Sequence, residues 1–582
     1  MNKYLLSLIL FLVTSSIYCQ EKNETIKNQQ ITISKSYTPE LSDVSKIRPV
    51  ISVNDSIKTK KVSITYSLIN IPVFSKFKLS KVSPLKLKKK YSDQTNYNSY
   101  FDFGFGSADQ LILDLSNHMV IDRFHSFGFD IINTNYGNIS STDISSEESE
   151  FILGLDHVFL SQKMEIAHKI FLNQDKINYY GIYSDSKLLT DPLILDKIIS
   201  NQERNSINFL SNWKFYNSFF KQASLSIKIL NDSYGSKEEV VDIKTDISIP
   251  IFRMNLLVTP KFSLINSFFK ESYYDRSNIN SFYSKFEAEF HFSNMNSEFK
   301  YKIGGVVNYF QSQSEETTPA VLFSPKILFS FGSDSSRFSP YLTLDGGVDL
   351  ISYSSISDLN PYVSPTLDLI PTQNLYIGRL GFRSSFDSGI DLNVGSHFNK
   401  QLNSFLFKRY AYDPSILNQG FRLANSFGLE YDDISKYGFF GETSFSFGRE
   451  NLIKASIFQY SYNLDKVSHA WNLPDFEGKL SLNIKISNNL RINMDARYIG
   501  KRPTAFKKVF LNQAPDDSPT VLKFLTPLSQ VKAEINYNLD SKWQPYLRTQ
   551  FNVGDLSSVW DSYLLNQNLI LAGIRYGFNL GF

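Results

Sequence analysis

The end of the chain, "AGIRYGFNLGF" (Ala572–Phe582), decides the fold. Successive side chains of a β-strand point to opposite faces, so every second residue belongs to one face. Counted back from the terminus, one face consists of Phe582, Leu580, Phe578, Tyr576, Ile574, Ala572 and Ile570. The other face consists of Gly581, Asn579, Gly577, Arg575 and Gly573. Because nothing polar interrupts the first set, the stretch predicts a strand whose outer face meets an apolar medium.

The composition favours a β-barrel that spans a membrane. Aromatic residues make up 15% of the 582 residues, although the mean hydropathy is only −0.21. A helical membrane protein needs runs of about 20 apolar residues, and none follows residue 13. A disordered chain has few aromatic residues. In a transmembrane barrel only alternate residues meet lipid, which fits both values. A large soluble β-sandwich or propeller is the alternative that composition leaves open.

The N-terminus reads as a secretory signal peptide. "MNKYLLSLILFLVTSSIYCQ" has Lys3, then an apolar core over residues 5–13 and small polar residues after it, and it is too short to anchor the chain. We expect cleavage after Cys19, which assigns residues 1–19 to the signal peptide. Cys19 is the only cysteine, so the mature chain then has no disulfide, cysteine-bound zinc or reactive thiol. A lipoprotein with Cys19 lipidated is the alternative, although Tyr18 is bulky for such a site.

Residues 20–95 differ from the rest of the chain and form a predicted basic periplasmic arm. They hold 14 lysines and one arginine against three aspartates and three glutamates, a net charge of +9. Residues 96–582 therefore carry −7. The densest basic cluster lies in "KLSKVSPLKLKKK" and consists of Lys78, Lys81, Lys86, Lys88, Lys89 and Lys90. We weigh three interpretations of the arm: a small plug inside an acidic barrel, a contact with an acidic partner or the lipid leaflet, and a solvated tail.

From residue 96 onward the sequence predicts a single all-β domain, a large antiparallel transmembrane barrel. Short alternating runs recur and are separated by Asn, Asp, Ser and Gly clusters. Examples are "KFEAEFHFS" (285–293), "KLSLNIKIS" (479–487), "RINMDARY" (491–498) and "VKAEINYNL" (531–539). Nearly 490 residues without repeats or a domain boundary argue against a sandwich or propeller.

The connections also alternate in length. Short turns such as 161–163, 487–489 and 541–542 are interspersed with long polar stretches such as 184–203 and 501–526. Short turns on one rim and long loops on the other are typical of outer-membrane barrels. We predict about 22 strands, with a range of 18–24; residues 350–372 and 400–420 do not read clearly as strands.

Two resemblances to known families support this prediction. The terminal residues Tyr576, Phe578, Leu580 and Phe582 resemble the sorting signal by which the barrel-assembly machinery recognises outer-membrane barrels. The stretches 470–502 and 551–564 with the closing strand resemble the barrel of TonB-dependent receptors. "NPYVSPTLDLIP" (Asn360–Pro371) and "KSYTPELSDVSKIRPV" (Lys35–Val50) resemble a Bacteroidetes-type group of such barrels that has little plug.

The chain departs from the TonB-dependent receptors ahead of the barrel. Those receptors carry a plug domain of well over a hundred residues, preceded by a box that contacts TonB. Here residues 20–95 are short, basic and poor in core residues. "QITISK" (Gln30–Lys35) is the one stretch that resembles such a box, and hexamers of this kind are common. Energised gating by a full plug is therefore not expected.

Charged residues on the polar faces of the strands are the candidate functional residues. They would line a water-filled lumen and set which solutes pass; the alternative is a salt-bridged ladder that fills a closed lumen. The candidates are Asp242, Lys244, Asp246, Lys285, Glu287, Glu289, Lys479, Lys485, Arg491, Asp495, Arg497, Lys532 and Glu534.

Nothing in the sequence indicates catalysis, a metal or a cofactor. The seven histidines (118, 125, 157, 168, 291, 397 and 469) form no recognisable metal motif. Asp156 and His157 are adjacent in a predicted strand and therefore point to opposite faces, which makes them poor catalytic partners. We interpret Tyr546, beside Trp543, as part of an interfacial aromatic belt.

We therefore expect an outer-membrane barrel of a Gram-negative cell, with its arm in the periplasm, that passes or takes up solutes. The alternative is a non-conducting structural or biogenesis subunit that docks partners through its arm and loops. The expected partners are outer-membrane lipid, the barrel-assembly machinery and a periplasmic or surface protein, with no nucleic acid.

Overall fold

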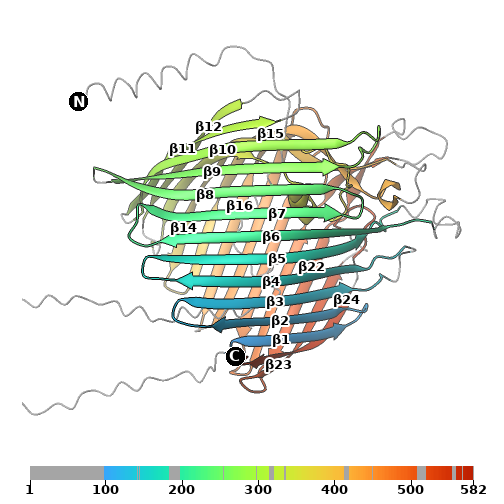
Figure 1. The fold of residues 1–582 in the computed structure, drawn as a ribbon, viewed down its shortest axis with the longest axis horizontal. Coiled ribbons are helices and arrows are strands. Elements are labelled where there is room, and N and C mark those ends of the chain that lie inside the picture. Colours follow the sequence, from blue (N-terminus) through green and yellow to red (C-terminus); the bar gives the residue numbers. More distant parts are fainter. Residues whose placement is uncertain are drawn as a thin grey trace, which may run out of the picture.

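The computed structural model shows a closed antiparallel barrel of 22 strands (Figure 1). The structure describes residues 97–580, except 140–141, 143, 183–196, 253, 296–297, 313–319, 333–335, 412–418, 449, 508–519, 554–558 and 566–567. The strand number predicted from the sequence is therefore confirmed. The arm and the signal peptide lie outside the described residues, as does Phe582.

The first half of the wall consists of β1 (Ser99–Gly106), β2 (Leu111–Val120), β3 (His125–Tyr136), β4 (Glu148–Leu160), β5 (Met164–Asn178), β6 (Asn201–Phe215), β7 (Phe220–Asp232), β8 (Lys237–Ile251), β9 (Met254–Phe269), β10 (Ile279–Asn294) and β11 (Phe299–Ser312). The second half consists of β12 (Ala320–Phe331), β13 (Ser339–Asp349), β14 (Thr372–Phe386), β15 (Ile390–Arg409), β16 (Phe427–Phe447), β17 (Asn451–Leu464), β18 (Phe476–Lys485), β19 (Leu490–Ile499), β22 (Leu528–Tyr537), β23 (Trp543–Val553) and β24 (Asn568–Phe578).

Each strand pairs with the next along the chain, and β1 pairs with β24 to close the ring. Only β20 (Arg502–Lys507) and β21 (Thr520–Leu525) depart from this order. They form a hairpin of their own between β19 and β22, which pair directly with each other. Closure satisfies the backbone groups that a sheet edge leaves unpaired, which is why barrels can span membranes.

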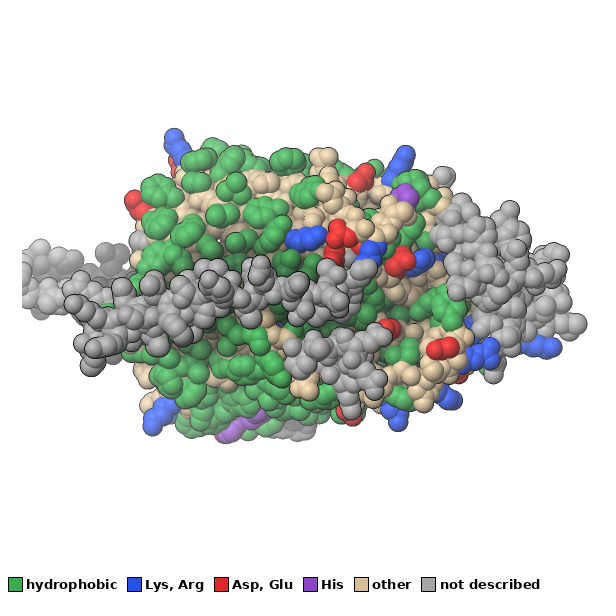
Figure 2. All heavy atoms as spheres, turned by 90° about the horizontal axis from the view of Figure 1, so that it is seen from above, with side chains coloured by type: hydrophobic (Ala, Val, Ile, Leu, Met, Phe, Trp, Pro, Cys, Tyr) green, Lys and Arg blue, Asp and Glu red, His purple; other side chains and the backbone are tan. Residues whose placement is uncertain are grey.

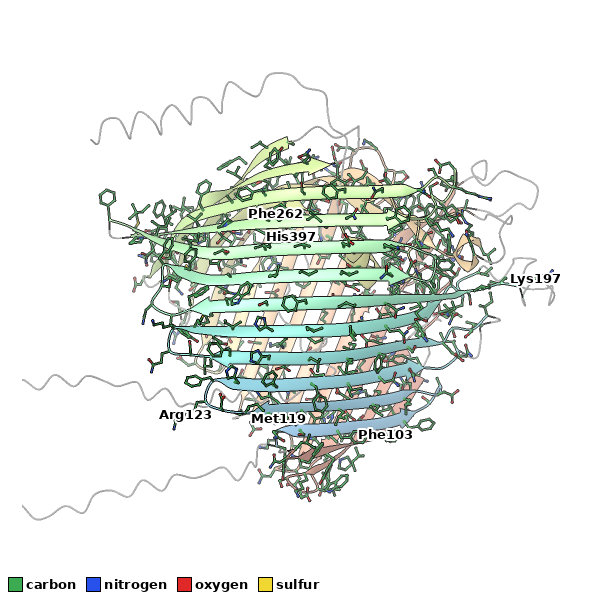
Figure 3. The ribbon with its side chains drawn as sticks, viewed as in Figure 1. Phe103, Met119, Arg123, Lys197, Phe262 and His397 are labelled. Carbon is green, nitrogen blue, oxygen red and sulfur yellow. The ribbon has the colours of Figure 1, made fainter. Side chains whose placement is uncertain are left out.

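The two rims differ as predicted. At the turn rim, connections between strands have two to seven residues, and the start of β1 and the end of β24 lie there. At the loop rim the connections have four to 28 residues. Figure 3 labels Arg123 at the turn rim and Lys197 at the loop rim.

The outer face of the wall is apolar. Large side chains such as Phe103, labelled in Figure 3, and Leu155 are 41% and 54% exposed. Hydrophobic side chains cover much of the surface in Figure 2. In β24 the outward residue Ile570 is 51% exposed, whereas its inward neighbour Leu571 is 2% exposed. A continuous apolar outer face on a closed barrel is typical of transmembrane barrels. Among the described residues, no helix is long and apolar enough to span a bilayer.

The main hydrophobic core lies at the loop rim, where the long connections pack together. It joins residues of the β5–β6, β9–β10, β13–β14, β15–β16 and β23–β24 connections, Tyr179, Tyr273, Tyr353, Phe421 and Tyr563 among them. Helix α3 (Tyr353–Leu359) and the single turn η3 (Gly420–Arg422) belong to these connections. The loops therefore fold over and into the mouth of the barrel.

Candidate functional site: a charged lumen closed by an inward-folded segment

An ionic network holds the closing strands together on the lumen side. Arg575 of β24 donates to Asp102 of β1 at 3.0 Å and to Glu534 of β22 at 3.0 Å. Arg548 of β23 reaches the same Glu534 at 2.7 Å. Tyr546 donates to Asp102 at 2.7 Å, and it is 4% exposed. Our interpretation of Tyr546 as an interfacial aromatic is therefore wrong. Trp543 precedes it by three residues, an odd number, and so lies on the opposite, outward face.

A glycine makes room for this network. A Cβ at Gly573 of β24 would lie 2.3 Å from the ring of Tyr546. The ring therefore rests directly on the backbone of β24. This close approach explains a glycine on the inward face of the terminal stretch.

The predicted charges of β8 and β10 face the lumen and are paired. Asp242 accepts from Ser263 at 2.5 Å, and Lys244 lies 3.7 Å from Asp246. Lys285 contacts Glu287 at 2.7 Å. Glu289 lies 3.3 Å from Lys326 of β12, which also contacts Asp345 of β13 at 2.7 Å. Lysines and carboxylates thus alternate across neighbouring strands.

The predicted charges of the last strands divide between the rim and the lumen. Lys485 and Arg491 both bind Glu450 at the turn rim, at 2.7 Å and 2.8 Å. Asp495 accepts from Ser481 at 2.7 Å. The other predicted charges of these strands lie opposite one another on the inner face: Lys479 is the Cα partner of Arg497, and Lys532 is the Cα partner of Asp495. The placement on the inner face is as expected; the role in selectivity stays a prediction.

The proposed assembly signal is described as far as Leu580. Tyr576 and Phe578 belong to the outward row of β24, and the ring of Tyr576 lies 4.2 Å from that of Trp543. The backbone of Leu580 donates to Asn98 at 2.9 Å. The basic cluster of the arm, Lys78 to Lys90, lies outside the described residues.

The connection from β13 to β14, residues 350–371, folds into the lumen and is the segment we call the lumen segment. Glu238 of β8 anchors its helix α3, because its carboxylate accepts from the backbone N–H of Tyr353 and of Ser354 (3.0 Å). A carboxylate at a helix N-terminus satisfies unpaired N–H groups and favours the helix dipole. The hydroxyl of Ser352 completes the cap by accepting from Ser355 at 3.1 Å.

Buried tyrosines fix the lumen segment to the wall. Tyr353 donates to Asp232 at 3.0 Å and accepts from Gln202 at 2.8 Å, while Tyr362 donates to Glu148 at 2.7 Å. Desolvation raises the pKa of Tyr353 and of Tyr362 well above the ordinary tyrosine value. Both hydroxyls therefore stay protonated and act as donors to the carboxylates.

The far end of the lumen segment reaches the opposite wall. Arg204 of β6 donates to the carbonyl of Pro361. Val363 forms a bridge with Phe427 at the start of β16, and Tyr431 of β16 donates to the carbonyl of Asp368 at 2.7 Å. Strands β6 and β16 are nearly half the ring apart and lie on the near and far walls of Figure 1. The segment therefore spans the barrel.

A second buried cluster ties the other loops to the lumen segment. The ring of Tyr362 stacks on Tyr563 at 3.5 Å. Arg409 at the end of β15 pairs with Asp561 at 3.0 Å, and both side chains are 1% exposed. Arg409 also donates to Ser562 at 2.9 Å, and Lys523 of β21 contacts Asp561 at 2.8 Å. A fully buried pair with several further hydrogen bonds holds its surroundings in one geometry.

A cavity of about 640 Å³ lies between the lumen segment and the wall. Strands β2 to β6 and β23 form one side of it, and Ser357, Asp358 and Pro361 of the lumen segment contribute to the other. Charges of both signs line it, including Glu150, Asp175 and Arg204, beside apolar residues such as Ile132. The volume is that of an ordinary small-molecule site.

The histidines of the first strands lie on both faces of the wall. His125, His157 and His168 stack on the outer face, with 3.1 Å between ring nitrogens of the first two. Asp156 points inward to His118 at 3.7 Å, so it and His157 diverge as expected. Within the described residues, no three His, Cys, Asp or Glu side chains are placed to hold a metal.

Sequence reasoning missed the residues that position the lumen segment: Glu238, Asp232, Gln202, Arg204, Arg409 and Asp561. The sequence held only an indirect indication of the lumen segment. Residues 350–372 broke the strand pattern while remaining rich in Tyr, Leu and Pro, which is typical of a packed connection and not of a solvated loop.

No protein-family model matches the sequence, and no curated protein matches it. Solved structures match the fold. The siderophore receptor PirA from Acinetobacter baumannii has a TM-score of 0.60 at 11% identity, covering 82% of this chain and 80% of PirA. The FrpB iron transporter from Neisseria meningitidis gives 0.59 at 11%, with 83% and 81% covered.

The ferric-catecholate import receptor Fiu from E. coli K12 gives a TM-score of 0.57 at 9% identity, covering 83% of this chain and 82% of Fiu. The expected likeness to TonB-dependent receptors is thus confirmed at the level of the fold. The chain has the 22-stranded transmembrane barrel fold that outer-membrane siderophore and iron receptors share.

Proposed function

We propose that this protein is an outer-membrane barrel, similar to TonB-dependent receptors, that passes or takes up solutes, and that its lumen charges set the selectivity. The observation that carries the proposal is the lumen segment, which spans a charged lumen and leaves a cavity of about 640 Å³ against one wall. A constriction lined with fixed charges selects solutes by size and charge. The siderophore and iron receptors with this fold support a role in uptake.

The basic arm is proposed to gate the same lumen from the periplasmic side. Its net charge of +9 opposes the −7 of the remaining residues, and attraction between opposite charges is stronger away from bulk water. A gate on each side of the cavity would make passage depend on both the arm and the lumen segment.

The second candidate is a non-conducting structural or biogenesis subunit. The observation in its favour is the density of contacts that hold the lumen segment, including the stacked Tyr362 and Tyr563. In this case the arm and the loop rim dock a periplasmic or surface protein. In either case we propose that the barrel-assembly machinery recognises the closing strand as a sorting signal.

Single-channel conductance in a planar bilayer tests the proposal. The proteins to compare are the mature chain, a form without residues 20–95, and the same truncated form carrying Glu238→Gln and Tyr353→Phe to loosen the lumen segment. Conductance that rises with each change supports two gates in series. Silence in all three, with correctly folded barrels, would leave the docking subunit as the function to pursue.

A further inference from the structure

The barrel wall is incompletely paired at one seam, between β12 and β13. These strands have 12 and 11 residues, yet only four residues of each are partners, Ile327–Ser330 with Leu344–Tyr341. On its other side β12 pairs with β11 over its whole length. Residues 320–326, towards the loop rim, therefore have no ladder partner on the β13 side.

Two features of the sequence accompany the missing ladder pairs between β12 and β13. The pairing of β13 with β14 shifts register at Gly346, between Asp345 and Gly347, and Gly347 has φ +153°, a conformation that favours glycine. Beyond it β13 stays paired with β14, and the carbonyl of Val348 turns inward and accepts from Lys285 of β10 at 2.5 Å. Pro325 lies on the unpaired part of β12, and proline is confined to sheet edges or bulges.

The outer side of the seam is apolar. Val321 and Phe323 of β12 are 69% and 68% exposed. An apolar chain lying against the outer face of β12 would cover both side chains.

The inner side of the seam is polar. Lys326 lies between Asp345 and Glu289, at 2.7 Å and 3.3 Å. Asn308 of β11 is 0% exposed, and neither its amide nitrogen nor its amide oxygen has a hydrogen-bond partner among the described residues. Its amide nitrogen lies 3.9 Å from the Cβ position of Gly347.

A strand edge without a ladder partner is stabilised when another group satisfies its backbone N–H and C=O groups. The same holds for the buried amide of Asn308. A molecule with an apolar chain and a polar head meets both needs, because its chain covers Val321 and Phe323 while its head reaches the edge and Asn308. Lys302 also lies 3.9 Å from Glu289, so two lysines balance the two carboxylates at the seam, and a head without net charge disturbs them least.

We propose that the β12–β13 seam is a lateral portal through which an amphiphile with an apolar chain and a polar head of no net charge passes between the outer leaflet and the lumen. This inference rests on the proposed transport function and names its substrate class. It also gives the lumen segment a second role, since that segment begins directly after β13 and bars the route towards the loop rim.

Photo-crosslinking of the full mature protein in liposomes tests the portal. The probe is a monoacylglycerol with a diazirine in its acyl chain close to the head, and adducts are mapped by mass spectrometry. We expect adducts on Val321 and Phe323 and also on the inward residues Asn308 and Lys326. Inward residues of the fully paired region, Glu534 and Arg575, serve as the internal control and should stay unlabelled. Labelling confined to outward residues all around the wall overturns the portal, as does preferential labelling of the seam by an anionic fatty-acid probe.

A tether across the seam provides the second measurement. The Cβ position of Gly346 lies 2.9 Å from the Cβ of Ser324, so Ser324→Cys with Gly346→Cys brings two thiols together, and the only native cysteine is Cys19. The control tether is Leu328→Cys with Thr343→Cys, at Cα partners in the paired half. Oxidation of the first pair should lower Asn308 labelling and monoacylglycerol uptake at least tenfold, and oxidation of the control should lower neither.

The outcomes separate the two proposals. Uptake of the amphiphile that is unchanged by the first tether, while small hydrophilic solutes pass, refutes the portal and leaves the proposed function standing. Seam labelling without passage of any solute refutes transport and identifies the seam as a lipid-binding site only.

Discussion

Arg575 of β24 and Asp102 of β1 form an ion pair of 3.0 Å although 473 residues separate them in the chain. The pair lies on the lumen side of the strands that close the barrel. Because Arg575 also binds Glu534 of β22, one guanidinium joins three strands where the first and last strands of the barrel meet.

Replacing Arg575 with Ala should destabilise the closed barrel by about 3–5 kcal/mol, since it removes the cation beside buried Asp102 and leaves Arg548 alone on Glu534. The expected result is a lower midpoint of urea unfolding, followed by the heat-dependent shift of the barrel band on gels. Arg497→Ala is the matched control, because no ion pair involving Arg497 is found among the described residues. An equal loss in both variants would show that the network adds nothing beyond its individual charges.

Removing the buried pair at the loop rim should loosen the loops and leave the wall intact. Arg409→Ala removes the buried cation beside Asp561, which is 1% exposed and keeps only the half-exposed Lys523 as a charged partner, and we expect a cost of about 3–5 kcal/mol. The measurement is limited proteolysis of the β23–β24 connection, which should become much faster. Lys408→Ala removes the half-exposed pair with Glu430 (2.6 Å), worth about 1 kcal/mol or less. Loops that resist protease equally in both variants would contradict the assigned role of Arg409.

The fold could be predicted because every strand of a barrel shows the same alternation, with one side chain facing the lumen and the next facing outward. The alternation in "KFEAEFHFS" places Lys285, Glu287 and Glu289 on one side, and the structure finds them there. Register is fixed by the same alternation, since a slip of one residue would turn the apolar face into the lumen.

The site could not be predicted because it depends on contacts between distant segments. Glu238 reads as one more polar residue at the start of a strand, and only the fold brings it beneath Tyr353, 115 residues later. Likewise, a lone Pro325 and a Gly346–Gly347 pair read as ordinary irregularities. Their joint effect on the β12–β13 seam appears only when the two strands are placed side by side.

Loosening the anchor of α3 should open the lumen. Glu238→Gln weakens the two acceptors that cap the helix, and Tyr353→Phe removes the hydroxyl that binds Asp232 and Gln202. Together they should raise single-channel conductance and current noise. Glu239→Gln is the control, because Glu239 is exposed on the other face of the same strand. Unchanged conductance in a folded double variant would mean that the lumen segment is not the constriction.

Charge removal at Glu289 should shift ion selectivity towards anions. Glu289 faces Lys326 and Lys302, at 3.3 Å and 3.9 Å, so Glu289→Gln leaves lysine charge in excess along this part of the lumen. The reversal potential under a salt gradient should move in the direction of anion permeability, with a change in permeability ratio of roughly two- to fivefold. High salt should diminish the shift, because screening shortens the reach of fixed charges.

Glu239→Gln again provides the control, since the same change on the outer face leaves the lumen charge untouched. A reversal potential that does not move at low salt would mean that permeating ions never approach Glu289, and that the charges of β10 to β13 form a closed ladder of pairs.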